Sequence, residues 1–233
     1  MLSVSGATAH PRCPCGPVTL PDMTDLLLIR HGESVWNADG RWQGQADPPL
    51  TELGRLQARE AATSIGHVDA VVTSDLERAA ETGAIIAREL GVDHLATEQA
   101  LRERDAGPLS GLTRSEIHRR FPGLLHDDPA GFEPGADGEP RWPDGWEPDA
   151  SLWTRVEVAL GAMARLVADG SVLVVTHGGV MYAVERHLGG PGRGRLANLD
   201  GVNVRSDGDR FVLGERVSLV DRELSTTIEA DRI

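Results

Sequence analysis

The stretch LLLIRHGES, residues 26–34, places an uninterrupted apolar run directly before an arginine, a histidine and a glycine. Two later stretches follow the same plan, DAVVTSD at residues 69–75 and VLVVTHGG at residues 172–179. Short continuous apolar runs are typical of strands that are buried on both faces of a sheet. The sequence therefore predicts a sheet that is covered on both sides, with polar residues where its strands end.

Helical segments separate these predicted strands. Thr51 is a suitable N-cap for a helix to about Ile65, because its hydroxyl can accept a hydrogen bond from the first turn. Further helices are predicted at Leu76–Leu90 before Gly91, at Ser151–Ala168 before Gly170, and at Gly178–Leu188. Residues 202–214, VNVRSDGDRFVLG, predict a hairpin that turns at Asp207-Gly208. The alternation predicts an α/β fold, a three-layer α/β/α sandwich with a mostly parallel sheet.

Two regions depart from this alternation. Residues 1–22 are rich in proline, glycine and other small residues, so we expect a disordered head before a single domain at residues 23–233. Within that domain, residues 122–150 are dense in proline, glycine and tryptophan, which predicts a long irregular insertion. We interpret the insertion as a partly ordered lid because it also carries large aromatic side chains. These are Phe132, Trp142 and Trp146.

Composition excludes several classes of function. No apolar run approaches the roughly 18 residues that a membrane-spanning helix needs. The net charge of −13 argues against nucleic acid or an acidic membrane as a partner, but a local pocket can still bind a small anion. All 23 basic residues are arginine, which excludes a Walker-A lysine and a lysine Schiff base.

The two cysteines are Cys13 and Cys15, both within the expected head. They are too few to ligate a structural zinc ion, and they form no disulfide framework. No convincing signal peptide precedes the first predicted strand. We therefore expect a cytoplasmic protein.

The strand ends predict where a ligand binds, because open α/β sheets hold ligands beyond the carboxyl ends of their strands. His31 and His177 each follow an apolar strand and precede a glycine, while Arg30 and Arg78 lie beside the same ends. Two arginines disfavour a dication, and no third metal ligand is evident, so we expect no metal. Arginine forks suit phosphate oxygens, a histidine can attack phosphorus, and Glu103 can supply a proton to the leaving group.

The joint pattern resembles the histidine phosphatase superfamily, also called the phosphoglycerate mutase-like family. The stretches that carry the resemblance lie in the family's order between Thr24 and a point past residue 200. They are RHGESVWN (30–37), RWQGQADPPLTELG (41–54), SDLERAAET (74–82), LRERDAG (101–107) and VVTHGG (174–179). The resemblance implies a single phosphoglycerate mutase-like α/β domain and a phosphohistidine mechanism that uses neither a metal nor a cofactor.

The resemblance also implies a role for each matching residue. His31 corresponds to the nucleophile, and Glu103 to the general acid that later activates water. Arg30, Arg78 and His177 correspond to ligands of the phosphoryl oxygens, with the two histidines expected on opposite sides of that group. The remaining matches imply substrate-binding groups. These are Ser34, Asn37, Gln43, Gly44 and the backbone of Gly178.

Two departures from the mutases favour a phosphatase. Ala106 stands where the glycolytic mutases have a tyrosine, and the lid is shorter and lacks their tryptophan–arginine–arginine run. Arg114 falls where the mutases have a substrate-binding lysine, and this difference does not distinguish a phosphatase from a mutase. We therefore expect a metal-independent phosphomonoester hydrolase that acts on a small phosphorylated metabolite. A phosphoglycerate mutase-type transfer and a non-catalytic binding relative remain alternatives, and the oligomeric state, with a homodimer as one alternative, stays open.

Overall fold

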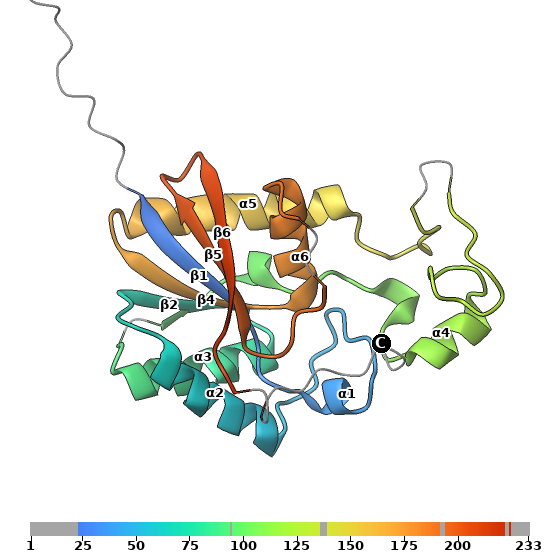
Figure 1. The fold of residues 1–233 in the computed structure, drawn as a ribbon, viewed down its shortest axis with the longest axis horizontal. Helices are drawn as coiled ribbons and strands as arrows, with labels where there is room; N and C mark the ends of the chain where they lie inside the picture. The colour runs from blue at the N-terminus through green and yellow to red at the C-terminus, as the bar shows by residue number, and fades with distance from the viewer. Residues whose placement is uncertain (1–22, 94, 136–138, 192–193, 222–223, 225–233) are drawn as a thin grey trace, which may run out of the picture.

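The computed structural model describes residues 23–93, 95–135, 139–191, 194–221 and 224 (Figure 1). The head expected at residues 1–22, with Cys13 and Cys15, lies outside the described residues. The strands are β1 (Thr24–Arg30), β2 (Ala70–Thr73), β3 (Leu95–Thr97), β4 (Ser171–Thr176), β5 (Asp200–Ser206) and β6 (Phe211–Ser218). The α-helices are α1 (Val35–Ala38), α2 (Glu52–Ser64), α3 (Glu77–Leu90), α4 (Arg114–Arg120), α5 (Asp149–Leu166) and α6 (Gly178–His187). Two short 3-10 helices lie at Gln99–Leu101 and Gly107–Leu109.

The sheet is mixed, in the order β3-β2-β4-β1-β5-β6. The first four strands of this order run parallel, and β5 and β6 add two antiparallel pairings at one side. Arg30 is in register with Thr176, and Thr73 with Val175. The carboxyl ends of β1, β2 and β4 therefore meet at one edge, as the sequence predicts.

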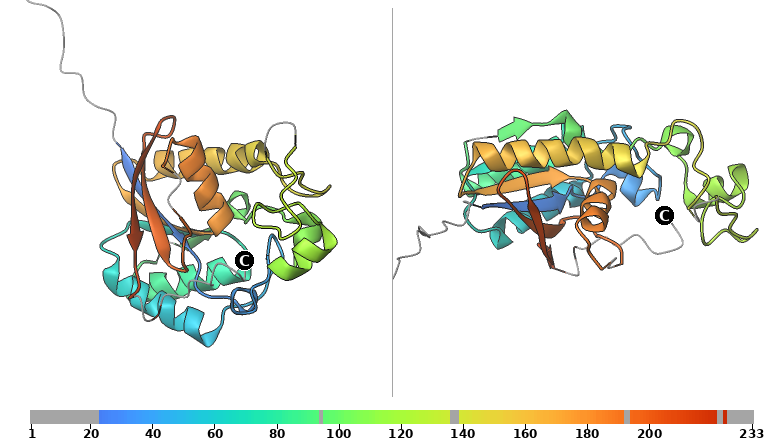
Figure 2. Two further views of the ribbon diagram at one scale, coloured as in Figure 1. Left: turned by 45° about the vertical axis from the view of Figure 1, so that its right-hand side comes forward. Right: turned by 90° about the horizontal axis from the view of Figure 1, so that it is seen from above.

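Helices cover both faces of the sheet, which Figure 2 shows from the side. Leu26, Leu28 and their neighbours in the sheet pack against α5 and α6. Ile29, Val71 and Val175 point the other way and pack against α2 and α3. Adjacent residues of one strand therefore serve two cores, which explains why the strands are continuous apolar runs. The predicted three-layer α/β/α architecture is confirmed.

Most predicted helix ends are close to those observed. Thr51 caps α2 by accepting a hydrogen bond from the backbone N–H of Gly54, and Gly91 ends α3 in the left-handed region with φ of 67°. The predicted helix at Ser151–Ala168 is displaced, since α5 begins at Asp149 and ends at Leu166. The hydroxyl of Thr24 lies 2.9 Å from the carbonyl oxygens of both Ala164 and Val167 and is a hydrogen-bond partner for the last turn of α5. The C-cap residue of this helix is Val167 and not Gly170.

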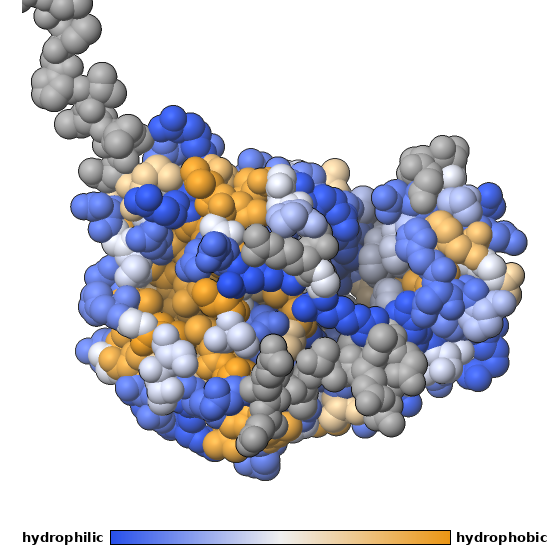
Figure 3. Space-filling model, viewed as in Figure 1, coloured by the Kyte–Doolittle hydropathy of each residue, from blue (hydrophilic) through white to orange (hydrophobic). Residues whose placement is uncertain are grey.

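The 122–150 insertion forms a lobe with α4 beside the sheet, at the right of Figure 1. No helix or strand occurs among its described residues before α5 begins, although Asp128 orders a turn by accepting hydrogen bonds from the N–H groups of Gly123 and Ala130, each at 2.8 Å. A small separate core of aliphatic and tryptophan side chains holds the lobe together. In Figure 3 its surface is largely hydrophilic, whereas apolar surface gathers over the sheet side. Within the described part of the chain, no helix has the length and apolarity to cross a membrane.

Candidate active site

His31 follows β1 at the sheet edge and is almost fully buried, with 2% of its surface exposed. Its backbone N–H donates to the Thr176 carbonyl at 3.0 Å, which ties it to the end of β4. Its ring Nδ1 lies 2.6 Å from the Gly32 carbonyl, which can only accept, so Nδ1 carries the proton. The Nε2 atom therefore presents a lone pair, and Arg78 Nε donates to it at 3.2 Å.

Both histidines of the site are held neutral. Burial lowers the pKa of His31 well below its usual value, and the charges of Arg78 and Arg30 lower it further. Burial also lowers the pKa of His177 well below its usual value, followed by the charge of Arg78. A neutral imidazole with a free lone pair is the form of histidine that can act as a nucleophile.

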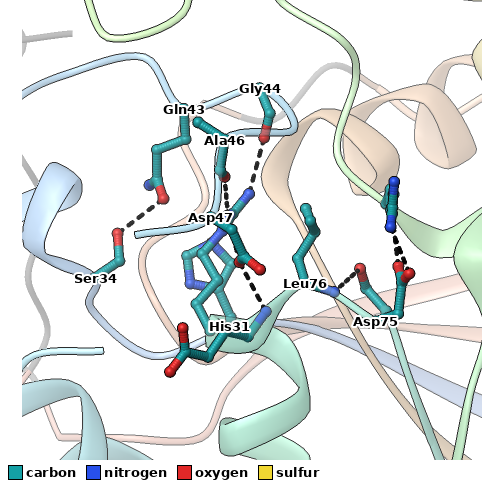
Figure 4. A network of polar contacts seen from close by, with 12 residues as sticks. His31, Ser34, Gln43, Gly44, Ala46, Asp47, Asp75 and Leu76 are labelled. Carbon is teal, nitrogen blue, oxygen red and sulfur yellow. Dashed lines mark hydrogen bonds and ion pairs between the residues drawn. The ribbon is translucent and has the colours of Figure 1, made fainter. Parts of the chain in front are cut away.

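Arg78 projects from the first turn of α3 and is fully buried. Its two terminal nitrogens donate to the carbonyls of Ala46 at 2.7 Å and Gly44 at 3.0 Å. Figure 4 shows both carbonyls directed at the guanidinium above His31. Burial lowers the pKa of Arg78 to about 10, so the group is still a cation at neutral pH. The carbonyls fix this cation in one orientation beside the histidine.

Arg30 is the last residue of β1 and supplies a second cation. Its Nη1 donates to the Leu196 carbonyl at 2.6 Å, which holds the side chain against the loop before β5. A Cβ placed on Gly178 would lie 3.9 Å from Arg30 Nε, so this guanidinium reaches the first turn of α6. The N-terminus of α6 and the two arginines thus converge on the same volume, as anion binding requires.

His177 lies directly behind His31. The two rings contact edge to face, with centroids 5.2 Å apart and planes inclined by 61°. The two histidines are therefore neighbours at the same sheet edge, and their contact with one phosphoryl group from opposite sides stays a prediction. Both ring nitrogens of His177 are buried without a hydrogen-bond partner. Such orphaned polar atoms are rare in folded proteins and occur where a ligand can satisfy them.

Glu103 faces the histidines from the loop between the two 3-10 helices. Its Oε1 accepts from the backbone N–H of Arg104 at 2.7 Å, and its Oε2 accepts from the N–H of Gly179 at 2.9 Å. A side chain on Gly179 would overlap this carboxyl group, whereas a Cβ on Gly178 would make only van der Waals contacts, at 3.9 Å or more. The second glycine of THGG therefore makes room for an acid.

Ser34 organises the pocket from behind. It caps α1, its N–H donates to Asn37 Oδ1 at 3.2 Å, and its hydroxyl donates to Gln43 Oε1 at 2.9 Å. With the oxygen held from behind, the amino group of Asn37 is the part that can donate into the cavity. Asn198, which the sequence reasoning missed, donates to the carbonyl of His31 at 2.8 Å. It follows no recognisable pattern in the chain.

Gly32 lets the loop that carries His31 pack directly on a helix. A Cβ here would lie 2.5 Å from the Gly54 carbonyl, in the first turn of α2. No larger residue fits at this position without moving the loop or α2.

The converging groups line one cavity of about 290 Å³. Eight of the residues predicted from the sequence line it, namely Arg30, His31, Asn37, Gln43, Gly44, Arg78, Glu103 and Gly178. Ser34 and His177 lie behind that lining. Three further arginines reach it, namely Arg41, Arg104 and Arg195. Among the described lining residues Glu103 is the only carboxylic acid, so the pocket is basic in a chain of net charge −13.

The outer wall of the cavity is aromatic. Trp42 and Trp146 line it, with ring centroids 6.0 Å apart, and Tyr182 lies in the same lining. Trp142 stacks on Trp146 at 4.0 Å and 9° but does not reach the cavity. The lid tryptophans thus divide into one that lines the site and one that supports it. Arg114 takes no part, since it pairs with Asp127.

The described residues contain no cluster of three or more histidine, cysteine, aspartate or glutamate side chains able to hold a metal ion. The arrangement instead collects cationic and neutral donors around a buried imidazole. This is the donor set that binds a tetrahedral oxyanion.

Comparison with known proteins agrees with this geometry. A model of the histidine phosphatase superfamily (branch 1) matches residues 26–206. A metal-independent phosphoserine phosphatase of Arabidopsis thaliana is 37% identical over 166 residues, covering 70% of this chain and 68% of that protein. A probable phosphoglycerate mutase GpmB of Enterobacter sp. (strain 638) is 37% identical over 159 residues, covering 67% of this chain and 70% of that protein. A solved mycobacterial glucosyl-3-phosphoglycerate phosphatase, complexed with VO3, has a TM-score of 0.66 at 26% identity, covering 82% of this chain and 96% of that one.

Proposed function

The chain belongs to the histidine phosphatase superfamily and is an enzyme of it, and on this premise we propose that it hydrolyses phosphomonoesters through a phosphohistidine at His31 without a metal. The observation that carries the proposal is the orientation of the His31 ring. Its Nδ1 is engaged by the Gly32 carbonyl, so Nε2 is the basic atom and faces the cationic cavity.

In the first step, His31 Nε2 attacks the phosphorus atom and the P–O bond to the leaving group breaks. Arg30 and Arg78 lie where they can neutralise the charge on the phosphoryl oxygens. The leaving oxygen takes a proton from the Glu103 carboxyl group. Two backbone N–H groups fix the direction of that carboxyl group.

In the second step, a water molecule attacks the phosphorus atom of the phosphohistidine. Glu103, now a carboxylate, takes a proton from this water, and the N–P bond breaks to return neutral His31. The lowered pKa of His31 favours this return, because burial and two arginines disfavour the protonated ring. The products are inorganic phosphate and an alcohol.

The cavity suits a small phosphorylated metabolite. Its volume of about 290 Å³ holds a phosphoryl group and a compact organic part. The aromatic wall and the outer arginines offer stacking and charge to that part. The phosphoserine phosphatase and the glucosyl-3-phosphoglycerate phosphatase among the similar proteins support this size class.

Hydrolysis is favoured over isomerisation by Ala106. This small residue lines the cavity where the resemblance to the mutases leads one to expect a tyrosine. A methyl group leaves room for water next to Glu103 and offers no hydroxyl to retain a phosphorylated product. The similarity to a probable phosphoglycerate mutase makes isomerisation the outcome to test against.

A panel of phosphorylated metabolites that includes O-phosphoserine and 3-phosphoglycerate, assayed for free phosphate, tests the proposal. We expect phosphate release from at least one small ester, and an acid-labile phosphoryl label that is absent in His31→Ala. Conversion of 3-phosphoglycerate to its isomer without phosphate release would overturn hydrolysis in favour of a mutase. Unchanged turnover in His31→Ala would overturn the role of His31.

A further inference from the structure

The loop that carries Glu103 has little support from regular structure. It connects the 3-10 helices Gln99–Leu101 and Gly107–Leu109 and pairs with no strand of the sheet. Side chains from other elements hold its backbone carbonyls instead. The Thr176 hydroxyl donates to the Leu101 carbonyl at 2.9 Å, and Gln45 Nε2 donates to the Glu103 carbonyl at 3.3 Å. The position of Glu103 therefore depends on residues distant in sequence.

Arg155, in α5, supplies most of this support. Its Nη1 donates to the carbonyls of Ala100 at 2.6 Å and Arg102 at 2.7 Å, and its Nη2 donates to the Glu103 carbonyl at 3.0 Å. One guanidinium thus binds three carbonyls within four consecutive residues. The planar fork of arginine has the number and spacing of donors for this task, and lysine does not.

Glu147 fixes the orientation of that fork. Arg155 Nε and Nη2 donate to its two carboxylate oxygens, each at 2.8 Å. Burial acts to raise the pKa of Glu147, but the hydrogen bonds and charge of Arg155 hold it below its usual value. The Glu147 carboxylate and backbone also bind the backbone of Asp105, by bonds of 3.1 Å and 2.9 Å. The pair therefore holds the loop on both sides of Glu103.

We propose that Arg155, oriented by Glu147, is a positioning residue that sets Glu103 at the distance required for proton transfer to the leaving group. The inference rests on the proposed function, since it concerns the general acid of that reaction. Arg155 does not line the cavity, and its contact with the acid is the hydrogen bond to the Glu103 carbonyl, so we expect it to act on proton transfer through the Glu103 backbone. Glu147 also follows Trp146 directly in sequence, which links the aromatic wall to the loop that carries Glu103.

The choice of leaving group distinguishes a positioning role of Arg155 from a general loss of the folded site. An alkyl phosphate needs a proton on its departing oxygen, whereas 2,4-dinitrophenyl phosphate departs as a stable anion without one. A displaced Glu103 should slow the first ester and spare phosphoryl transfer from the second. Loss of the phosphate pocket would slow both.

The experiment compares kcat/KM, which reports formation of the phosphohistidine and not its hydrolysis, for these two esters in Arg155→Met, Arg155→Lys, Glu147→Gln and the reference variant Glu103→Gln. The alkyl ester is the one that the wild-type enzyme hydrolyses fastest in the panel above. Arg165→Met is the matched control, since Arg165 also lies in α5 but binds the Gly208 carbonyl, far from Glu103. Thermal unfolding of each variant accompanies the kinetics.

We expect Arg155→Met to lower kcat/KM for the alkyl ester about 10²-fold and for the dinitrophenyl ester less than about threefold, the same pattern that we expect of Glu103→Gln. Arg155→Lys keeps the charge but loses the fork, so it should show the same selectivity with a smaller loss. Wild-type behaviour of Arg155→Lys would show that charge alone matters and would overturn positioning. Equal losses for both esters in Arg155→Met would also overturn it.

Glu147→Gln keeps the test decisive if Arg155→Met does not fold. This variant retains a hydrogen-bond acceptor and should show the same selectivity at about tenfold; equal rates for both esters at the wild-type level would overturn the inference. The reference reactions distinguish a failure of the proposed function from a failure of the positioning role alone. If the wild-type enzyme releases no phosphate, or Glu103→Gln spares the alkyl ester, the proposed role of Glu103 is wrong and the inference falls with it.

Discussion

His31 Nε2 lies 3.2 Å from Arg78 Nε, and the arginine donates a hydrogen bond to it. The atom proposed to attack phosphorus is therefore already in contact with the cation proposed to stabilise the phosphoryl oxygens. Burial lowers the pKa of both side chains, so the histidine is neutral while Arg78, at a pKa of about 10, keeps its charge. The site is assembled from a neutral nucleophile and fixed cations, which favours catalysis by electrostatic preorganisation.

Arg78→Met should lower kcat/KM by at least about 10²-fold, because a buried donor to the developing charge is lost. Arg78→Lys should recover little, since one ammonium cannot reach His31 and the carbonyls of Gly44 and Ala46 together. Arg88→Met is the control, because Arg88 lies on the exposed side of the same helix and pairs with Glu89. Steady-state kinetics measure the effect, and a loss below about threefold in Arg78→Met would contradict the assignment.

Gly179→Ala should lower kcat for alkyl phosphates at least tenfold. The new methyl group would occupy the space of the Glu103 carboxyl group and remove it from the Gly179 N–H. Gly66→Ala provides the control, because no atom lies within 4 Å of its new methyl group and Gly66 does not line the cavity. Neither glycine has a positive φ, so backbone strain does not confuse the comparison. Equal activity of the two variants would refute the steric argument.

The sheet and the grouping of polar residues at its edge could be predicted from the sequence because their signals are local. A continuous apolar run predicts a strand buried on both faces, and the residue after it must lie at the sheet edge. His31 and His177 were found in this way. Their mutual geometry could not be predicted, because edge-to-face contact depends on side-chain rotamers that packing selects.

The residues that hold Glu103 in place have no recognisable pattern in the local sequence. Arg155 reads as an ordinary polar residue of a predicted helix, and only the tertiary fold brings it to the carbonyls around Glu103. The packing of Gly32 on Gly54 left no local signal either, because only the fold brings the loop after β1 against α2. Contacts between residues distant in sequence decide both positions, and one sequence does not encode them as a pattern.

The two buried histidines should make stability depend on pH. Their pKa values lie well below the unfolded value of about 6.5, so below that pH the unfolded chain binds protons that the folded chain does not. The free energy of unfolding should therefore fall as the pH decreases, by about 1 kcal/mol per histidine between pH 7.5 and 5.5.

Urea unfolding at these two pH values checks this loss in the wild-type protein and in His31→Asn and His177→Asn. Each variant should lose about half of the pH dependence. An unchanged pH dependence in both active-site variants would show that other groups cause it.

Trp146→Ala should raise KM for the preferred ester about tenfold while kcat changes less. Trp146 lines the cavity beside Arg104, whose guanidinium lies 5.3 Å from the ring centroid, so the ring is placed to contact the organic part of a substrate. Such a contact is made equally in the ground state and the transition state, and its loss appears in KM. Trp142→Ala removes the stacked partner, which packs in the same lobe but does not line the cavity, so KM should stay within about threefold. Equal increases in KM for both variants would mean that the tryptophans act only by supporting the lobe, whereas an increase confined to Trp146→Ala would assign the outer wall to substrate binding.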